Sequence, residues 1–247
     1  MHDIMKTTYN MKKGTTMTLA LNHIYNMDGI EAIKQYHDDK RVIIVTDPPF
    51  NIGYKYGSYV DKKSTEEYLG MLSDIITNFP TAMIHYPESL YALTASTGII
   101  PERVVSWVYN SNTRRQHREI CFFGIKPDFK QVRQPYKNPN DKRVRHLMET
   151  GHTGAPLYDW WNINQVKNVS KAKTGHPCQM PLKVMDNIVG ILPRADDTII
   201  IDPFAGSGTT LLAAKNAGFD YIGFDIDNDY CNMARERLGL PIESEEE

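Results

Sequence analysis

The feature that most constrains this chain is a strand, a glycine-rich turn, a helix and a second strand in immediate succession. The apolar run Thr198–Ile201 leads into the sequence DPFAGSGTT, which occupies Asp202–Thr210. A helix is expected over Thr209–Ala217, and the next apolar run, Tyr221–Phe224, ends at Asp225. Strands that alternate with helices in this way predict an α/β domain with a mostly parallel sheet.

The rest of the chain continues the same alternation. The run RVIIVT over Arg41–Thr46 predicts a strand buried on both faces of a sheet. Ser64 and Glu67 have the spacing of a capping box at the start of a helix. Further strands are expected at Leu19–Tyr25, Thr81–His85, Arg103–Tyr109 and Ile120–Ile125, and further helices at Gly29–Tyr36, Leu182–Leu192 and Asp229–Leu238.

Length and composition exclude several classes of protein. A chain of 247 residues can bury a core without disulfides or a structural metal. Its net charge of -2 excludes a histone-like polycation, and no apolar run reaches the roughly 18 residues of a membrane-spanning helix. The three cysteines are widely spaced, which predicts reduced thiols in a cytoplasm-like compartment and argues against a Cys-rich zinc site. We therefore expect a single α/β domain over residues 1–247.

Positive charge is concentrated in one segment, residues 126–175. Ten Lys and Arg residues stand there against four Asp and Glu residues, so the segment carries +6 within an otherwise acidic chain. Trp160, Trp161 and several tyrosines and asparagines lie among these charges. Cations, amides and aromatic rings together favour phosphate contacts and base stacking, although a solvated lysine-rich loop has the same composition.

The glycine-rich turn predicts a ligand site at the end of its strand. Glycines let a ligand approach the backbone closely, and the following helix points its N-terminus at the same place. Asp225 follows Gly206 at the distance where an acid accepts hydrogen bonds from a ribose diol. No Lys follows Gly208, which argues against a Walker phosphate loop. Asp202 would repel a phosphate and suits a ligand that carries an ammonium group.

A second ligand site is expected at Asp47-Pro48-Pro49-Phe50, directly after the strand Arg41–Thr46. Two successive prolines make a rigid corner, and the missing N–H of Pro49 leaves the carbonyl of Pro48 available as an acceptor. A carboxylate, a carbonyl and an aromatic ring suit a planar heterocycle with an exocyclic amine. The amine would donate its two hydrogens to Asp47 and the Pro48 carbonyl, while Phe50 stacks on the ring.

These two motifs, in this order, resemble the amino-group DNA methyltransferases of adenine N6 and cytosine N4. The catalytic tetrapeptide of that family is Asp/Asn/Ser-Pro-Pro-Tyr/Phe/Trp, and in its β ordering the tetrapeptide precedes the S-adenosylmethionine loop. The target-recognition region lies between the two, where this chain has its basic segment. Similarity extends to RRQHREI at Arg114–Ile120, to His176–Pro181 and to the residues before Asp225, and so covers most of the chain.

The resemblance implies a fold, a cofactor and a reaction. The fold is a Rossmann-like sheet of seven mostly parallel strands, with an antiparallel strand near one edge, helices on both faces and a small inserted basic recognition region at 126–175. The methyl group passes from S-adenosylmethionine to the N6 of a flipped-out adenine in DNA by direct in-line attack. A homodimer and a cognate endonuclease remain open as partners, and the location is the cytoplasm of a bacterial or phage-infected cell.

The resemblance assigns a catalytic set and a cofactor-binding set of residues, and the cations of the basic segment supply a DNA-binding set. The catalytic set is Asp47, Pro48, Pro49 and Phe50. The cofactor-binding set is Asp202, Phe204, Ala205, Gly206, Ser207, Gly208, Thr209, Asp225, His176 and Pro177. The DNA-binding set is Lys130, Arg133, Lys137, Arg143, Arg145 and Lys171, and no metal is expected.

Alternatives remain at this point. Asp as the first residue of the tetrapeptide favours adenine, since the cytosine-N4 enzymes more often have Ser there, and cytosine-N4 methylation stays open. A non-catalytic nucleic-acid-binding module would need only the basic segment. Cys178 mimics the Pro-Cys nucleophile of cytosine-C5 enzymes but precedes the cofactor loop, which argues against that role. Met180 stands where the family often has Lys, and Asp28 fits a helix cap better than a cofactor contact.

Overall fold

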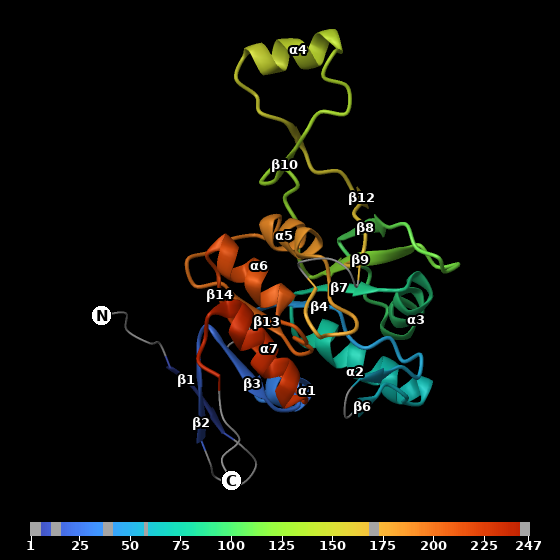
Figure 1. Ribbon diagram of the computed structural model, residues 1–247. Helices are drawn as coiled ribbons and strands as arrows, with labels where there is room; N and C mark the ends of the chain where they lie inside the picture. Colours follow the sequence, from blue (N-terminus) through green and yellow to red (C-terminus); the bar gives the residue numbers. More distant parts are fainter. Residues whose placement is uncertain (1–5, 11–15, 37–41, 57–58, 168–172, 243–247) are drawn as a thin grey trace.

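The computed structural model describes residues 6–10, 16–36, 42–56, 59–167 and 173–242. Its centre is an eight-stranded sheet with the strand order β12-β8-β9-β7-β4-β13-β14-β3 (Figure 1). Strand β9 is antiparallel to both of its neighbours, and every other pair in this sheet that shares hydrogen bonds is parallel. The strands are β3 (His23–Asn26), β4 (Val42–Thr46), β7 (Thr81–His85), β8 (Arg103–Val108), β9 (His117–Phe123), β12 (Trp160–Asn162), β13 (Ile199–Asp202) and β14 (Asp220–Asp225).

Helices cover both faces of this sheet, as the sequence predicts. One face packs against α1 (Gly29–Lys34), α2 (Thr65–Asn78) and α3 (Pro87–Thr97), and the other against α5 (Leu182–Gly190), α6 (Thr209–Ala217) and α7 (Asn228–Leu238). Strand β4 shows why two apolar layers are needed. Val42 and Ile44 belong to the first layer, while Ile43 and Val45 belong to the second. Successive side chains of a strand point to opposite faces, so an uninterrupted apolar strand requires cover on both.

The seven strands expected from the family resemblance are one too few. The additional strand, β12, comes from the basic segment and pairs in parallel with β8 at the edge of the sheet. Trp161 of this strand is buried, and the indole N–H of Trp107 donates to the carbonyl of Ile163 just beyond it. Burial of these two indoles fixes β12 on the edge of β8, which a three-residue run could not signal in the sequence.

Other predicted elements are confirmed with small differences. The strand expected at Leu19–Tyr25 is divided at Asn22, whose φ of 60° breaks the extended conformation. Residues before the break form β2 (Thr16–Ala20), which pairs with β1 (Lys6–Asn10) in a separate hairpin. Helix α3 was not expected, and the capping box at Ser64 is present with both of its hydrogen bonds. None of the helices in the described parts of the chain is long and apolar enough to cross a membrane.

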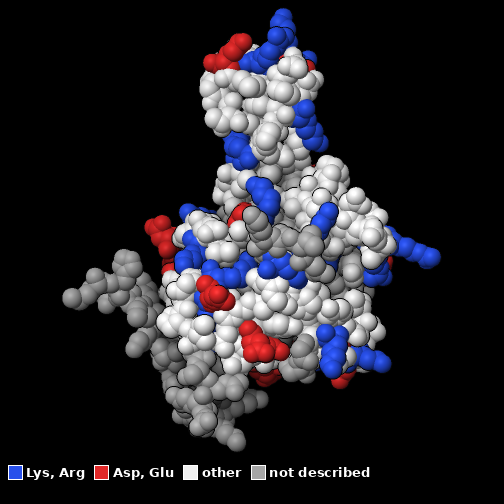
Figure 2. Space-filling model, viewed as in Figure 1, with Lys and Arg blue, Asp and Glu red and all other residues white. Residues whose placement is uncertain are grey.

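The basic segment projects from the body of the molecule, with α4 at its far end (Figure 1). Helix α4 spans Lys142–Glu149 and buries none of its side chains. The strands β10 (Arg133–Gln134) and β11 (Ala155–Pro156) pair with each other between α4 and the body. Figure 2 shows Lys and Arg side chains spread over this projecting part. A further short hairpin, β5 (Lys55–Tyr56) with β6 (Tyr59–Val60), follows the proline corner.

Candidate active site

The two sequence motifs meet in one cavity of about 770 Å³. Strands β4 and β13 are parallel neighbours, so the residues that follow them lie at the same edge of the sheet. The hydroxyl of Thr46, the last residue of β4, donates to Asp202 Oδ1 at 2.9 Å and joins the two strand ends. All four residues of the proline corner line the cavity, together with the predicted cofactor-binding residues except Gly208.

The Asp47 carboxyl group is largely buried and only half satisfied. Its Oδ2 lies 3.7 Å from Nη1 of Arg118, whereas its buried Oδ1 has no hydrogen-bond partner among the described residues. Burial raises the pKa of Asp47 to about 7, Arg118 opposes this rise, and the negative charge of Asp202 adds to it. A carboxyl group with a free acceptor oxygen and a pKa near neutrality can accept a hydrogen bond and then a proton.

Arg118 lies in the candidate site beside Asp47, and sequence reasoning did not assign it there. Its guanidinium group lies 4.5 Å from the ring centre of Phe50 and 5.3 Å from that of Trp107, and its side chain is 11% exposed. The charge of Asp47 helps to raise the pKa of Arg118 against the effect of burial. Because β9 runs antiparallel to β7, its first residues lie at the edge where the parallel strands end. Only the pairing of β9 reveals that Arg118 reaches Asp47.

A series of hydrogen bonds links the proline corner to α2 and to the end of β7. The hydroxyl of Tyr68 on α2 lies 2.5 Å from the carbonyl oxygen of Pro49 and 2.6 Å from Nε2 of His85. The N–H of Tyr86 donates to Nδ1 of His85 at 2.7 Å, so Nε2 carries the ring proton and donates to Tyr68. Burial lowers the pKa of His85 to about 3 and keeps the ring neutral. Tyr68 can therefore donate its own hydrogen to Pro49.

The glycine-rich turn is held by the acid that the sequence places after it. Gly206 has a φ of 49°, and its N–H donates to Asp225 Oδ2 at 2.8 Å. A Cβ at this position would lie 2.9 Å from Nε2 of His176, so the turn and the histidine approach each other as only glycine permits. Gly208 has a different reason to be glycine, since a Cβ there would lie 2.7 Å from the Cβ of Ala234 on α7.

The carboxylate of Asp202 accepts hydrogen bonds from groups of the protein itself. Its Oδ1 accepts from Thr46 and, at 3.1 Å, from the N–H of Phe204, and Thr210 also donates to this carboxylate. Burial raises the pKa of Asp202 to about 6. The sequence suggested that this acid suits an ammonium group of a ligand. In the structure its hydrogen bonds instead hold the turn against the neighbouring strand.

The residues from His176 onwards form one wall of the cavity. His176 packs against the ring of Tyr230 with ring centres 4.3 Å apart, and burial lowers its pKa to about 4. Met180 lines the cavity and its sulfur lies 3.5 Å from Nη1 of Arg118. Cys178 also lines the cavity, and burial raises the pKa of its thiol. A thiol that is protonated at neutral pH is a poor nucleophile. This agrees with the argument from sequence position that Cys178 is not a catalytic nucleophile.

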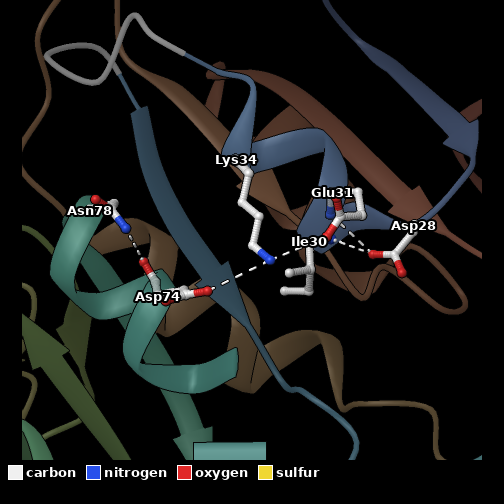
Figure 3. A network of polar contacts seen from close by, with 6 residues as sticks. All are labelled: Asp28, Ile30, Glu31, Lys34, Asp74 and Asn78. Atoms are coloured by element: carbon white, nitrogen blue, oxygen red, sulfur yellow. Dashed lines mark hydrogen bonds and ion pairs between the residues drawn. The ribbon is translucent and has the colours of Figure 1, made fainter. Parts of the chain in front are cut away.

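Asp28 caps a helix, as its sequence position suggests. Its Oδ1 accepts from the backbone N–H groups of Ile30 and Glu31 at the start of α1 (Figure 3). Lys34 then bridges from Glu31 to Asp74 of α2, and the amide of Asn78 donates to the carbonyl of Asp74. This network holds α1 against α2 at the rim of the cavity, which Asp28 also lines.

The predicted DNA-binding residues lie apart from the cavity lining. Lys130, Arg133, Lys137, Arg143 and Arg145 belong to the projecting segment, and Lys171 lies outside the described residues. The ammonium group of Lys137 lies 4.8 Å from the ring centre of Tyr158 and 5.4 Å from that of Trp160. Within the described ranges, no group of three or more His, Cys, Asp or Glu side chains could hold a metal ion.

Comparison with known proteins relates this arrangement to one family. The model of the N6/N4 DNA methylases matches residues 87–236. The Type II methyltransferase M.BglII of Bacillus subtilis is 28% identical over 91% of this chain and 71% of its own length. The DNA adenine methyltransferase YhdJ of Escherichia coli is 22% identical over 88% of this chain and 82% of its own length.

Solved structures share the fold at low sequence identity. The PvuII DNA methyltransferase, described as cytosine-N4-specific, has a TM-score of 0.63 and 15% identity, covering 87% of this chain and 85% of its own. A complex of M1.HpyAVI with SAM has a TM-score of 0.57 and 23% identity, covering 88% of this chain and 99% of its own. The family model spans more than half of the residues, so this chain belongs to the N6/N4 DNA methylases, the amino-group DNA methyltransferases.

Proposed function

We propose that this protein transfers a methyl group from S-adenosylmethionine to the exocyclic N6 of adenine in DNA. The observation that carries the proposal is the free acceptor oxygen of Asp47, buried in the same cavity as the glycine-rich turn. A buried polar atom without a hydrogen-bond partner destabilises the ligand-free protein. A ligand that donates the missing hydrogen bond recovers this free energy on binding. The amine of a nucleobase is such a ligand, and it reaches the cavity only when the base leaves the duplex stack.

The cavity fits S-adenosylmethionine, which supplies a methyl group on a positively charged sulfur. Its volume of about 770 Å³ accommodates a nucleoside with an amino-acid side arm beside a flipped base. Asp225, fixed by the N–H groups of Gly206 and Asp227, would accept hydrogen bonds from the ribose. The remaining proposed contacts to the cofactor are Asp202, Phe204, Ala205, Ser207, Thr209, His176 and Pro177, with Gly208 supporting the turn from behind.

The proline corner would activate the amine without a covalent enzyme intermediate. Ionised Asp47 accepts one hydrogen of the amine and the Pro48 carbonyl accepts the other, which concentrates the nitrogen lone pair for attack on the methyl carbon. Orientation of the two reactants in this way contributes up to roughly 7–11 kcal/mol to barrier lowering. S-adenosylmethionine would supply the methyl group from its sulfonium, and Asp47 would take the proton that the methylated nitrogen releases. Its pKa of about 7 suits that step.

The projecting segment would serve as the target-recognition region of a single methyltransferase domain. Its cations, drawn in blue in Figure 2, would contact phosphates. The cluster of Lys137, Tyr158 and Trp160 would contact bases or sugars. Adenine is favoured over cytosine because the tetrapeptide begins with Asp, and one relative of similar length is named an adenine methyltransferase. Relatives named Type II methyltransferases also support a cognate endonuclease as the partner enzyme.

Mass spectrometry of nucleosides tests the proposal directly. DNA incubated with the protein and S-adenosylmethionine should contain N6-methyladenine. The variant Asp47→Ala should lose this product and keep its affinity for the cofactor, while Asp196→Ala, which changes an exposed acid, should retain both. N4-methylcytosine as the product would assign the chain to the other branch of the family, and a fully active Asp47→Ala variant would remove the proposed role of the corner.

A further inference from the structure

Asp61 is a buried acid for which the sequence analysis predicts no role. It follows β6 and is 1% exposed, and it lines the same cavity as Asp47. Its backbone is fixed, because its N–H donates to the carbonyl of Tyr54 and its carbonyl accepts from Gly53, both at 3.0 Å. Neither carboxylate oxygen has a hydrogen-bond partner among the described residues. The backbone therefore holds an unsatisfied carboxylate in place at the cavity wall.

The other acids on this side of the cavity have partners, and the comparison indicates what Asp61 lacks. Asp47 has the guanidinium of Arg118, and Asp202 has donors from Thr46 and Phe204. A carboxylate that is removed from water without a cation or a donor is strongly unfavourable. Asp47 can bind a neutral amine, since a cation already compensates its charge. Asp61 instead requires a ligand that brings positive charge and N–H groups together.

The surroundings of Asp61 place it near the residues assigned to the amino-acid end of the cofactor. The ring of Tyr56 on β5 lies 6.2 Å from that of His176, measured between ring centres. Tyr56 pairs with Tyr59 in the β5/β6 hairpin, and Asp61 continues this pairing through its N–H to the carbonyl of Tyr54. Tyr56 and Asp61 both line the cavity, and burial raises the pKa of the Tyr56 hydroxyl. The family resemblance implies that His176–Pro181 flank the methionine end of the cofactor, so we place the methionine portion of the cofactor beside His176.

We propose that Asp61 binds the α-ammonium group of the methionine portion of S-adenosylmethionine. The inference rests on the proposed function, because it assumes that this cofactor occupies the cavity. Two oxygens of the carboxylate can accept two of the three ammonium hydrogens, which satisfies the acid and neutralises its charge. Asp202, the acid that the sequence suggested for an ammonium, already accepts hydrogen bonds within the protein. The sulfonium carries charge but offers no N–H donor, so it fits Asp61 less well.

Calorimetry with three ligands tests this assignment. The ligands are S-adenosylmethionine, S-adenosylhomocysteine, which keeps the ammonium but has no sulfonium, and 5′-methylthioadenosine, which has neither. Asp61→Asn should weaken binding of the first two by at least about 30-fold, as for one partner removed from a buried charge pair. Its affinity for 5′-methylthioadenosine should stay as in the unaltered protein. Glu66→Gln, the same charge change at an exposed position outside the cavity, should leave all three affinities unchanged.

Thermal unfolding separates this role from a structural one. Without ligand, Asp61→Asn should melt about 2–4 °C higher than the unaltered protein, because an unsatisfied buried charge has been removed. Its stabilisation by S-adenosylmethionine should shrink correspondingly. A lower melting temperature with all three ligands weakened would instead indicate that Asp61 is structural and overturn the assignment. Weaker binding of S-adenosylmethionine alone would identify the sulfonium as the partner and overturn it as well.

The two proposals can fail separately. If the unaltered protein binds none of the three ligands, both the cofactor site and the role of Asp61 are refuted. If it binds them and Asp61→Asn binds them equally well, the cofactor site stands and only the ammonium assignment is refuted.

Discussion

Replacing Arg118 by glutamine should move the pH dependence of methyl transfer to higher pH. The amine of the base needs an ionised Asp47, and with a pKa of about 7 roughly half of this group is ionised at pH 7. Activity of the unaltered enzyme should therefore increase as the pH is raised through about 7. It should decrease as the pH is lowered through the same range, because Asp47 becomes protonated. The guanidinium at 3.7 Å favours the ionised form, and such a neighbour lowers a carboxyl pKa by about 1–3 units.

The size of the expected effect follows from the same numbers. Without the guanidinium, a rise of about 1–3 units in the pKa of Asp47 leaves between about a tenth and a thousandth of the group ionised at pH 7. Activity at pH 7 should drop by about fivefold to several hundredfold. It should recover as the pH is raised, because the carboxylate becomes ionised again at a higher pH. Recovery at high pH distinguishes a change in ionisation from a general loss of structure.

The measurement is kcat/KM for DNA between about pH 5.5 and 9.5 with saturating cofactor, which reports groups of the complex before DNA binds. Arg115→Gln is the matched control, because Arg115 is an exposed arginine paired with Glu88 at 3.6 Å. The low-pH part of its kcat/KM profile, where activity rises with pH, should coincide with that of the unaltered enzyme. A rise that stays near pH 7 in Arg118→Gln, with activity reduced equally at every pH, would show that Arg118 acts through packing on Phe50 rather than through charge.

Three further predictions concern other parts of the site. Tyr68→Phe removes the donor to the Pro49 carbonyl, so kcat should fall about tenfold with cofactor affinity unchanged in calorimetry, and an unchanged kcat would argue against a positioning role. Cys178→Ser should retain methylation measured by labelled methyl incorporation, because the raised pKa of this thiol disfavours a nucleophile; an inactive variant would reopen the covalent mechanism. Arg143→Ala should reduce the slope of log affinity against log salt for DNA by about 0.9, whereas an unaltered slope would remove Arg143 from the phosphate contacts.

Sequence patterns predict those elements of the fold whose formation depends on residues adjacent in the sequence. The segment from β13 through the glycine-rich turn to β14 follows the sequence expectation closely, because buried strands, a helix and a glycine at positive φ each leave a local signature. The meeting of Asp47 with Asp202 also follows, since parallel strands end at a common edge. Both predictions use only the order and direction of the elements.

Residues that reach the site across long distances in the chain could not be found in this way. Arg118 lies in the site because β9 runs antiparallel to β7. Tyr68 lies there because one turn of α2 faces the proline corner. His85 reads as an ordinary strand residue, and its hydrogen bond to Tyr68 depends on the packing of α2 against β7. Each of these contacts is fixed by side-chain direction and packing, which neither composition nor periodicity encodes.

The contact between Arg118 and Met180 offers an explanation for a departure from the family. Where the family often has Lys, this chain has Met180, whose sulfur lies 3.5 Å from Nη1 of Arg118. A Lys there would place a second cation beside a guanidinium that already neutralises Asp47, and two buried like charges repel strongly.

We therefore expect Met180→Lys to lower both stability and activity, and Arg118→Met combined with Met180→Lys to regain part of each, since one cation near Asp47 is restored. A double-mutant cycle on the free energy of unfolding should give a coupling of about 0.5–3 kcal/mol between the two positions. Additive effects would mean that the charge at position 118 is independent of the residue at 180. Coupling would mean that the two positions interact, and that a cation at either of them can compensate the charge of Asp47, the proposed catalytic acid.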